Sequence, residues 1–159
     1  MVKGFIVRKV VALSFLSYCI NIYAKPNKKN NELPQGWVEI KPGGLSKCAR
    51  GEEFSFFYRP GQSKKIVIDF IGGGACWNAN TCSKKTATFV GSVDYIRKRA
   101  QQGLNGIYNH QNPDNPIKDW NHLIIPYCTG DVHWGENDTT YTDDQGQKFI
   151  IHHRGATNT

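Results

Sequence analysis

Two short stretches of the sequence have residue types and spacing that could support chemistry. The first is Ile71-Gly-Gly-Gly-Ala75, which ends an apolar run and places three glycines in succession. Glycines at the end of a strand expose backbone N–H groups, because no side chain covers them. Two kinds of ligand are bound by such N–H groups: a phosphate, and the oxyanion that develops when a carbonyl group is attacked.

The glycine pattern distinguishes between these two ligands. The stretch lacks the G-x-G-x-x-G spacing of dinucleotide-binding turns, and no Gly-Lys-Ser/Thr follows it as in a P-loop. Glycines after an early strand instead match the HGGG-type turn, which donates backbone N–H groups to an oxyanion in ester hydrolases. A triple glycine is also typical of a tight turn without function. The pattern by itself therefore leaves an oxyanion site and a plain turn open.

The second stretch, residues 129–134, contains an aspartate and a histidine after another apolar run. Asp131 and His133 could act as a general base or as two metal ligands. We favour a structural interpretation, in which Asp131 caps the loop and His133 packs within it. His152 and His153 are adjacent, so on a strand they point to opposite faces and cannot chelate one metal ion together. We expect one of these two to support the loop and the other to be exposed, with no metal ion or other cofactor.

Cysteine spacing predicts how the glycine turn is held. Four cysteines lie outside the leader described below: Cys48, Cys76, Cys82 and Cys128. An even number in an exported chain favours disulfides, which have three possible connectivities. The short polar turn from Cys76 to Cys82 can close on itself, which leaves Cys48 to reach Cys128. A zinc site would need two closely spaced ligand pairs, and the cysteines provide one.

The first 24 residues have the pattern of a signal peptide. Basic residues precede an apolar run at positions 10–22, and Ala24 suits the position before a cleavage site. The run is about 13 residues long, which is short against the roughly 20 that a membrane-spanning helix needs. We therefore expect a secreted or periplasmic protein without a stable membrane anchor after cleavage. Residues 25–35 are expected to form a linker.

The charge balance does not indicate a nucleic-acid partner. The chain has 20 Lys and Arg against 13 Asp and Glu, a formal net charge of +7. Loss of Lys3, Arg8 and Lys9 with the leader would leave 17 basic residues against 13 acidic ones, a net charge of +4. No basic motif interleaved with aromatic residues follows. We expect no nucleic-acid partner and, for the full-length protein, a monomer.

The elements that position these stretches can be predicted from apolar periodicity. Strands are expected at residues 37–40, 54–59, 64–71 and 121–127, a helix at 89–102 and an ordered loop at 103–120. Residues 64–71 are almost continuously apolar, as a strand buried on both faces of a parallel sheet is. The order strand, loop, helix, strand predicts an α/β architecture in which at least part of the sheet is parallel.

Three stretches taken together resemble the pectin acetylesterase family, which includes Notum. They are "IGGGACWNANTC" (71–82), "GIYNHQNPDNPIKDWNHLIIPYCTGDVHWG" (106–135) and "IIHHRGATN" (150–158). The resemblance runs from about residue 37 to residue 159. It implies that residues 36–159 belong to a single three-layer α/β-hydrolase-like domain with a largely parallel central sheet. It also implies hydrolysis of carboxylic esters by a Ser, Asp and His triad, without a cofactor.

The resemblance also implies roles for individual residues. Gly74 and Ala75 would donate the backbone N–H groups of an oxyanion hole, and Gly73 would allow the ligand to approach closely. Candidates for the substrate cleft are Trp77, Asp131, His133 and Trp134. The implied disulfides are Cys76–Cys82 and Cys48–Cys128, the same pairs that the spacing favours. Notum has an aromatic residue where this chain has Ala75, so we expect a different acyl pocket and no long lipid acyl substrate.

The family's nucleophile lies on a G-x-S-x-G elbow that follows the third stretch, and no serine of this sequence has that context. We therefore expect the sequence to stop before the elbow, with the catalytic Ser, Asp and His beyond Thr159. The expected function is that of an exported carboxylic ester hydrolase, acting on an acetylated polysaccharide or a similar ester and inactive as this chain. The alternatives are a secreted carbohydrate-binding module without catalysis and a degenerate gene product. A sheet cut at this point would leave an apolar strand edge unpaired.

Overall fold

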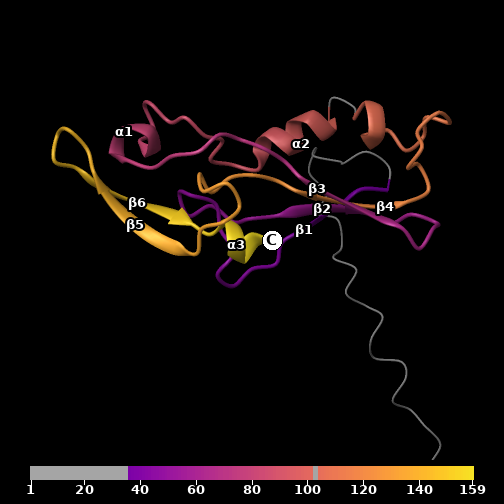
Figure 1. Cartoon of the computed structure of the whole chain (residues 1–159), viewed down its shortest axis with the longest axis horizontal. Helices are drawn as coiled ribbons and strands as arrows, with labels where there is room; N and C mark the ends of the chain where they lie inside the picture. Colours follow the sequence, from indigo (N-terminus) through magenta and orange to yellow (C-terminus); the bar gives the residue numbers. More distant parts are fainter. Residues whose placement is uncertain (1–35, 102–103) are drawn as a thin grey trace, which may run out of the picture. The chain divides into compact units, whose positions relative to one another are not determined.

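A computed structural model describes residues 36–101 and 104–159, which belong to a compact unit of residues 31–159. The predicted signal peptide and linker lie outside the described residues. In chain order the elements are β1 (Val38–Ile40), β2 (Phe56–Arg59), β3 (Ile66–Phe70), α1 (Ala79–Cys82), α2 (Asp94–Gln101), the 3-10 helix η1 (Gly106–Tyr108), β4 (Asn121–Ile125), β5 (Asn137–Thr142), β6 (Lys148–His153) and α3 (Gly155–Asn158) (Figure 1). Within this part of the chain, no helix has both the length and the apolar character needed to cross a bilayer.

Four strands form a mixed sheet in the order β1-β2-β4-β3, and β5 and β6 form a separate antiparallel hairpin. β3 and β4 are parallel, with Ile66 opposite Asn121, because the chain between them crosses over through α2. The other two pairings in the sheet, β1 with β2 and β2 with β4, are antiparallel. The predicted α/β arrangement with a parallel component is confirmed. The expectation of a largely parallel sheet is wrong for the described residues.

The two faces of this sheet are covered unequally. On one face, Phe57 of β2 and Ile124 of β4 are buried against Ile96 of α2, and Figure 1 shows α2 lying along this side. The other face carries three apolar residues of the edge strand β3, which are half exposed: Ile66 (50%), Ile68 (51%) and Phe70 (52%). The prediction that this strand is buried on both faces is therefore wrong. The described residues supply a helical layer on one face, not the predicted three layers.

Helix α2 begins five residues later than predicted because Phe89 has another role. Phe89 forms an isolated antiparallel bridge with Gly74, and the helix starts at Asp94, whose N–H is bonded by the Ser92 hydroxyl. The Arg97 guanidinium donates to both carboxylate oxygens of Glu39 on β1, at 3.0 Å from its Nε. Burial acts to raise the pKa of Glu39, but the Arg97 bonds outweigh it and hold this pKa below its ordinary value. This ion pair fixes α2 on the sheet.

Candidate functional site

The three glycines lie where β3 ends, and two of these positions tolerate no side chain. A Cβ atom on Gly74 would lie 2.1 Å from the Thr88 carbonyl oxygen, and the φ of 80° at Gly74 is unfavourable for other residues. A Cβ atom on Gly73 would lie 2.3 Å from the Tyr127 ring, whereas at Gly72 it would meet nothing within 4 Å. The turn is therefore shaped by close approach at its second and third glycines.

Hydrogen bonds fix the carbonyl side of this turn. The Gly73 carbonyl accepts from the Val90 N–H at 2.7 Å, and the Ala75 carbonyl accepts from the Thr88 hydroxyl at 2.6 Å. Among the described residues, no hydrogen bond is formed by the N–H groups of Gly72, Gly73 or Gly74. Ala75 lies next to the bridge between Gly74 and Phe89, so its N–H is directed toward the same segment. The donor roles of Gly74 and Ala75 stay predictions.

Two disulfides anchor the glycine turn, and both are the predicted pairs. Cys76 is joined to Cys82, and Cys48 to Cys128. The Cys76 N–H also donates to the Gly130 carbonyl at 2.9 Å, which ties the turn to the loop after β4. Between the cysteines of the short loop, Asn78 and Thr81 form a capping box at the start of α1. The loop after β3 and the loop after β4 are thus held together.

Asp131 organises the loop after β4, as we expected. Its carboxylate accepts hydrogen bonds from the Thr129 hydroxyl at 2.5 Å, the His133 N–H at 3.2 Å and the Gly155 N–H at 2.7 Å. A Cβ atom on Gly155 would lie 2.4 Å from one of its oxygens, so α3 begins in close contact with this carboxylate. These three donors account for Asp131 structurally, and its place in a substrate cleft stays a prediction.

His133 connects the same loop to the exit of β3. Its Nε2 lies 3.0 Å from the Ile71 carbonyl oxygen, and its ring packs edge-on against Phe70 and Tyr127. The backbone here is strained, because Val132 (φ 55°) and His133 (φ 62°) are both in the left-handed region. Conformations of this kind often accompany functional sites, and they persist only where the surroundings enforce them.

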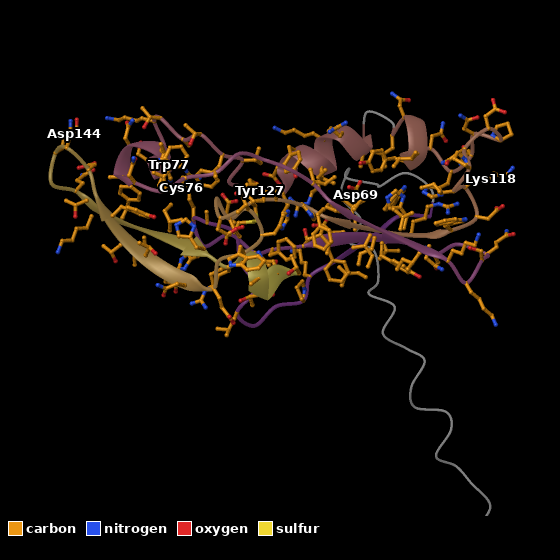
Figure 2. The ribbon with its side chains drawn as sticks, viewed as in Figure 1. Asp69, Cys76, Trp77, Lys118, Tyr127 and Asp144 are labelled. Carbon is orange, nitrogen blue, oxygen red and sulfur yellow. A yellow bond between two sulfur atoms is a disulfide. The ribbon has the colours of Figure 1, made fainter. Side chains whose placement is uncertain are left out.

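Two exposed tryptophans flank these loops. The Trp77 side chain follows Cys76 and is 68% exposed, and Trp134 follows His133 and is 85% exposed. Figure 2 labels Trp77, Cys76 and Tyr127 in this part of the molecule. Large aromatic surfaces in water are available to bind a ligand. Their membership of a cleft stays a prediction.

The adjacent histidines of β6 have separate partners. His153 Nδ1 lies 3.0 Å from the Thr129 carbonyl oxygen and its Nε2 lies 3.1 Å from the Tyr141 hydroxyl, so His153 supports the loop after β4. His152 Nδ1 lies 2.8 Å from a carboxylate oxygen of Asp138. Both side chains are half-buried, so the expectation that one is exposed is wrong.

A group with the composition of a metal site lies beside the turn, although its sulfur atoms are already bonded. One nitrogen of His153 and the sulfurs of Cys76 and Cys82 lie within 4.8 Å of one another. Metals bind thiolates, and here the two sulfurs form a disulfide. In this oxidised form the three residues do not provide a metal-binding set.

Tyr127 contributes to this region, although it was not among the residues predicted from the sequence. Its ring limits the side chain at position 73, and its hydroxyl accepts from the Val132 N–H at 2.8 Å. Burial raises the pKa of Tyr127. The available signal was its position, an aromatic residue between a buried strand and Cys128.

Comparisons with known proteins agree with this arrangement of motifs. The family model described as Pectinacetylesterase matches residues 38–159. The palmitoleoyl-protein carboxylesterase Notum of Schmidtea mediterranea is 31% identical over 94 residues, which are 57% of this chain and 18% of that protein. Pectin acetylesterase 5 of Arabidopsis thaliana is 28% identical over 106 residues, 61% of this chain and 24% of that protein.

A crystal structure of the Wnt deacylase Notum from Drosophila aligns with 74% of this chain and 34% of its own, at 21% identity and a TM-score of 0.45. The aligned part of this chain thus spans only about a fifth to a third of the relatives it matches. The match of the family model to residues 38–159 covers most of the sequence. The chain belongs to the pectinacetylesterase family.

Proposed function

We propose that this chain forms part of an exported carboxylic ester hydrolase of the pectin acetylesterase type, and that it supplies the oxyanion-hole turn. The observation that carries the proposal is the glycine turn after β3. Its carbonyl groups are bonded to the chain, whereas the Gly73 and Gly74 N–H groups are unused among the described residues. Free N–H donors in a fixed turn are what a developing oxyanion requires.

In the proposed reaction, an acyl ester carbonyl lies against this turn, and the Gly74 N–H donates a hydrogen bond to its oxygen as negative charge develops. The second proposed donor, the Ala75 N–H, is directed toward the segment of Phe89 in this chain and would have to turn from that segment to contribute. Gly73 keeps its proposed role of allowing close approach to the backbone, although the space at its Cβ position is taken by the Tyr127 ring in this chain. The triad of Ser, Asp and His would come from polypeptide beyond the 159 residues, with the serine on a G-x-S-x-G elbow. A reaction of this type needs neither a metal ion nor another cofactor.

The remaining features of the proposal concern the whole protein. We propose that residues 1–24 direct export and that the complete domain has a three-layer α/β-hydrolase fold. The half-exposed apolar face of β3, with Ile66, Ile68 and Phe70, supports a further packing layer, because apolar residues that alternate along a strand normally cover a core. The proposed substrate is an acetylated polysaccharide or a similar ester, and the complete protein is proposed to be monomeric.

Two preparations test the proposal: the 159-residue chain, and the product of the complete reading frame at its locus. We expect the complete product to release acetate from acetylated pectin and to be labelled by a fluorophosphonate on one serine. We expect the 159-residue chain to do neither. Ester hydrolysis by the 159-residue chain would contradict the placement of the nucleophile, and a complete product without esterase activity would contradict the proposed function.

The alternative of a carbohydrate-binding module is favoured by one observation, the exposure of Trp77 and Trp134 beside the turn. Exposed aromatic rings can stack on sugar rings without any catalysis. Titration of the chain with acetylated and deacetylated pectin oligosaccharides separates the two functions. Saturable binding that is lost in Trp134→Ala, together with no turnover by the complete product, would favour the binding module.

A further inference from the structure

Two histidines lie in contact beneath the covered face of the sheet, at the end of β4 opposite the glycine turn. His122 is fully buried, at 0% exposure, and His110, from the segment 104–120, is 9% exposed. His110 Nε2 lies 3.1 Å from His122 Nδ1, and His110 Nδ1 lies 3.0 Å from the Lys118 carbonyl oxygen. His122 Nε2 is buried and has no hydrogen-bond partner in the described part of the chain. The pair therefore joins the segment to β4 through a contact between two ring nitrogens.

The contacts of this pair determine where its protons lie. The Lys118 carbonyl can only accept, so His110 Nδ1 must carry a proton. A neutral histidine ring carries one proton, so His110 Nε2 has a lone pair and can only accept. The hydrogen bond between the two rings therefore uses a proton on His122 Nδ1 when both rings are neutral. The neutral pair then has a single arrangement, in which His122 Nε2 is bare. An additional proton, whichever ring takes the charge, always leaves an N–H at His122 Nε2, where the described residues offer no acceptor.

Groups on every neighbouring element face this pair. The rings of Trp37 and Tyr108 pack on His122, with centroids at 5.2 Å and 5.4 Å. Their π faces offer limited compensation to a positive ring. Asp69 of β3 favours a charge on His122, but its carboxylate already accepts from the Tyr108 hydroxyl. Arg59 of β2 opposes that charge and donates to the Lys118 carbonyl at 3.2 Å. On the α2 side, Arg99 acts to lower the pKa of Tyr108 and Tyr95 acts to raise it.

We propose that the His110–His122 pair is a pH-sensitive latch, which holds residues 104–120 on the sheet while both rings are neutral and releases this segment when the pair takes up a proton. The segment is also attached by the Tyr108 bond to Asp69, by bonds from Arg59 to the Lys118 carbonyl and from the Ser63 N–H to the Asp119 carbonyl at 2.9 Å, and by packing of Leu104 and Tyr108 on the buried cluster that includes Ile96 and Ile124. Its own order comes mostly from bonds within it, such as those from Asn115 to the carbonyls of Ile107 and Asn109. These internal bonds do not depend on the sheet, so they can persist when the contacts with the sheet are lost.

Electrostatics supports the same direction. Burial lowers the pKa of His122 to about 4, and burial also lowers the pKa of His110. A lowered histidine pKa means that the docked state binds fewer protons than the released state, so docking is favoured by rising pH. The latch is fully closed above the ordinary histidine pKa near 6.5, and it weakens as the pH falls from there toward 4.

The first test reads the proton positions directly. In the full chain at pH 7, long-range ¹H–¹⁵N spectra of the histidine rings report which ring nitrogens carry protons. We expect protons on Nδ1 of both His110 and His122 and a bare Nε2 on His122. A proton on His122 Nε2 at pH 7 would overturn the latch, because the neutral pair would then already contain the N–H that is proposed to open it.

The second test measures release, by hydrogen exchange of the full chain between pH 7 and pH 5 after correction for the intrinsic exchange rate. We expect opening of residues 104–120 to increase about tenfold per pH unit below pH 6, as uptake of one proton requires, and residues 137–153 to change less than about twofold. His122→Asn retains an amide group toward His110 and removes one of the two titrating rings, so opening of its segment should rise much less steeply with falling pH than in the wild type. His152→Asn, which removes a half-buried histidine elsewhere, should respond as the wild type does.

These outcomes separate the latch from a general loss of stability in acid. Exchange in residues 104–120 that is independent of pH, or that rises equally in His122→Asn, would overturn the proposal. A parallel rise in residues 137–153 would also overturn it, since the whole unit would then be opening. The result does not depend on esterase activity, so the latch and the proposed function can fail separately.

Discussion

The two ends of the β3–β4 pair are built in opposite ways. At the carboxyl ends, the chain leaves β3 through glycines, and the exposed Trp77 and Trp134 follow in the adjoining loops. At the amino end of β4, His122 is completely buried and packs against Trp37 and Tyr108. One end has backbone N–H groups that the described residues do not bond and exposes aromatic rings, whereas the other encloses polar groups.

The difference shows what each end can do. At the carboxyl end, the polar side chains are used to hold the loops, as in the three bonds accepted by Asp131, while N–H groups at Gly73 and Gly74 are left unused by the described residues. At the amino end the backbone is paired, and a side-chain atom, His122 Nε2, is unbonded. The first end therefore has backbone donors for the proposed ligand, and a proton is poorly accommodated at the second.

The largest expected effect is on the glycine turn. Gly74→Ala should lower the free energy of unfolding by about 3 kcal/mol, because the new Cβ meets the Thr88 carbonyl and the φ of 80° is strained for alanine. Gly72→Ala should change it by less than about 0.5 kcal/mol, since nothing lies within 4 Å of its Cβ position. Urea unfolding of the two variants measures the difference. Equal effects would show that the turn is not shaped by close approach.

Loss of the loop carboxylate should be nearly as costly. Asp131→Ala removes the acceptor for three donors and is expected to lower the free energy of unfolding by about 2 kcal/mol. Asp144→Ala, at the exposed tip of the β5–β6 hairpin (Figure 2), is the matched control and should change it by less than about 0.5 kcal/mol. Chemical denaturation at pH 7 compares them. An Asp131→Ala variant as stable as the control would mean that this carboxylate does not order the loop.

The carboxyl end was largely predictable from the sequence. The glycines, the two disulfides and the ordering role of Asp131 depend on local spacing and on cysteine pairing, which the sequence displays. The strands 121–127 and 64–71 were also placed correctly within two residues at each end, because their apolar runs are strong. The exposure of β3 was not predicted, because its position at the edge of the described sheet depends on the tertiary arrangement and not on its own sequence.

Other parts of the structure had weak signals. The β5–β6 hairpin was missed because its strands are mostly polar and its turn depends on Asp143, whose side chain accepts from the Gln145 and Gln147 N–H groups. The histidine pair was missed because His110 and His122 belong to different elements, a loop and a strand, and only the fold brings them together. The start of α2 was misplaced because Phe89 pairs with Gly74 across a loop.

A smaller effect is expected on the covered face of the sheet, from Tyr108, whose ring packs on His122 and whose hydroxyl donates to Asp69 of β3. Burial, together with the bond to Asp69, raises the pKa of Tyr108 from its ordinary value near 10 to about 12. A raised tyrosine pKa favours the neutral form in the fold, so its contribution is present below pH 10 and is lost as the pH rises from 10 through 12. Tyr108→Phe should cost about 1 kcal/mol at pH 8 and less at pH 11.

Thermal unfolding of the wild type and Tyr108→Phe at both pH values checks this. Asp69→Asn retains an oxygen acceptor but removes the charge, so its loss of stability between pH 8 and pH 11 should be smaller than that of the wild type. If the difference between wild type and Tyr108→Phe is the same at pH 8 and pH 11, the tyrosine does not titrate as its contacts require. The surroundings of Tyr108 and His122 would then be less enclosed than their contacts indicate.

The smallest effect on stability is expected for Trp134, at the end where we expect ligand binding. The Trp134 side chain is 85% exposed, so Trp134→Ala should change the free energy of unfolding by less than about 0.5 kcal/mol. If the carboxyl end binds a ligand, the same change should weaken the binding of an acetylated pectin oligosaccharide by about tenfold, since a stacked ring contributes about 1 kcal/mol or more. Trp120→Ala, which removes a ring near Lys65 on the amino side of β4, is the binding control. Unchanged affinity in Trp134→Ala would remove this residue from the cleft and leave the glycine turn as the remaining evidence for a ligand at this end.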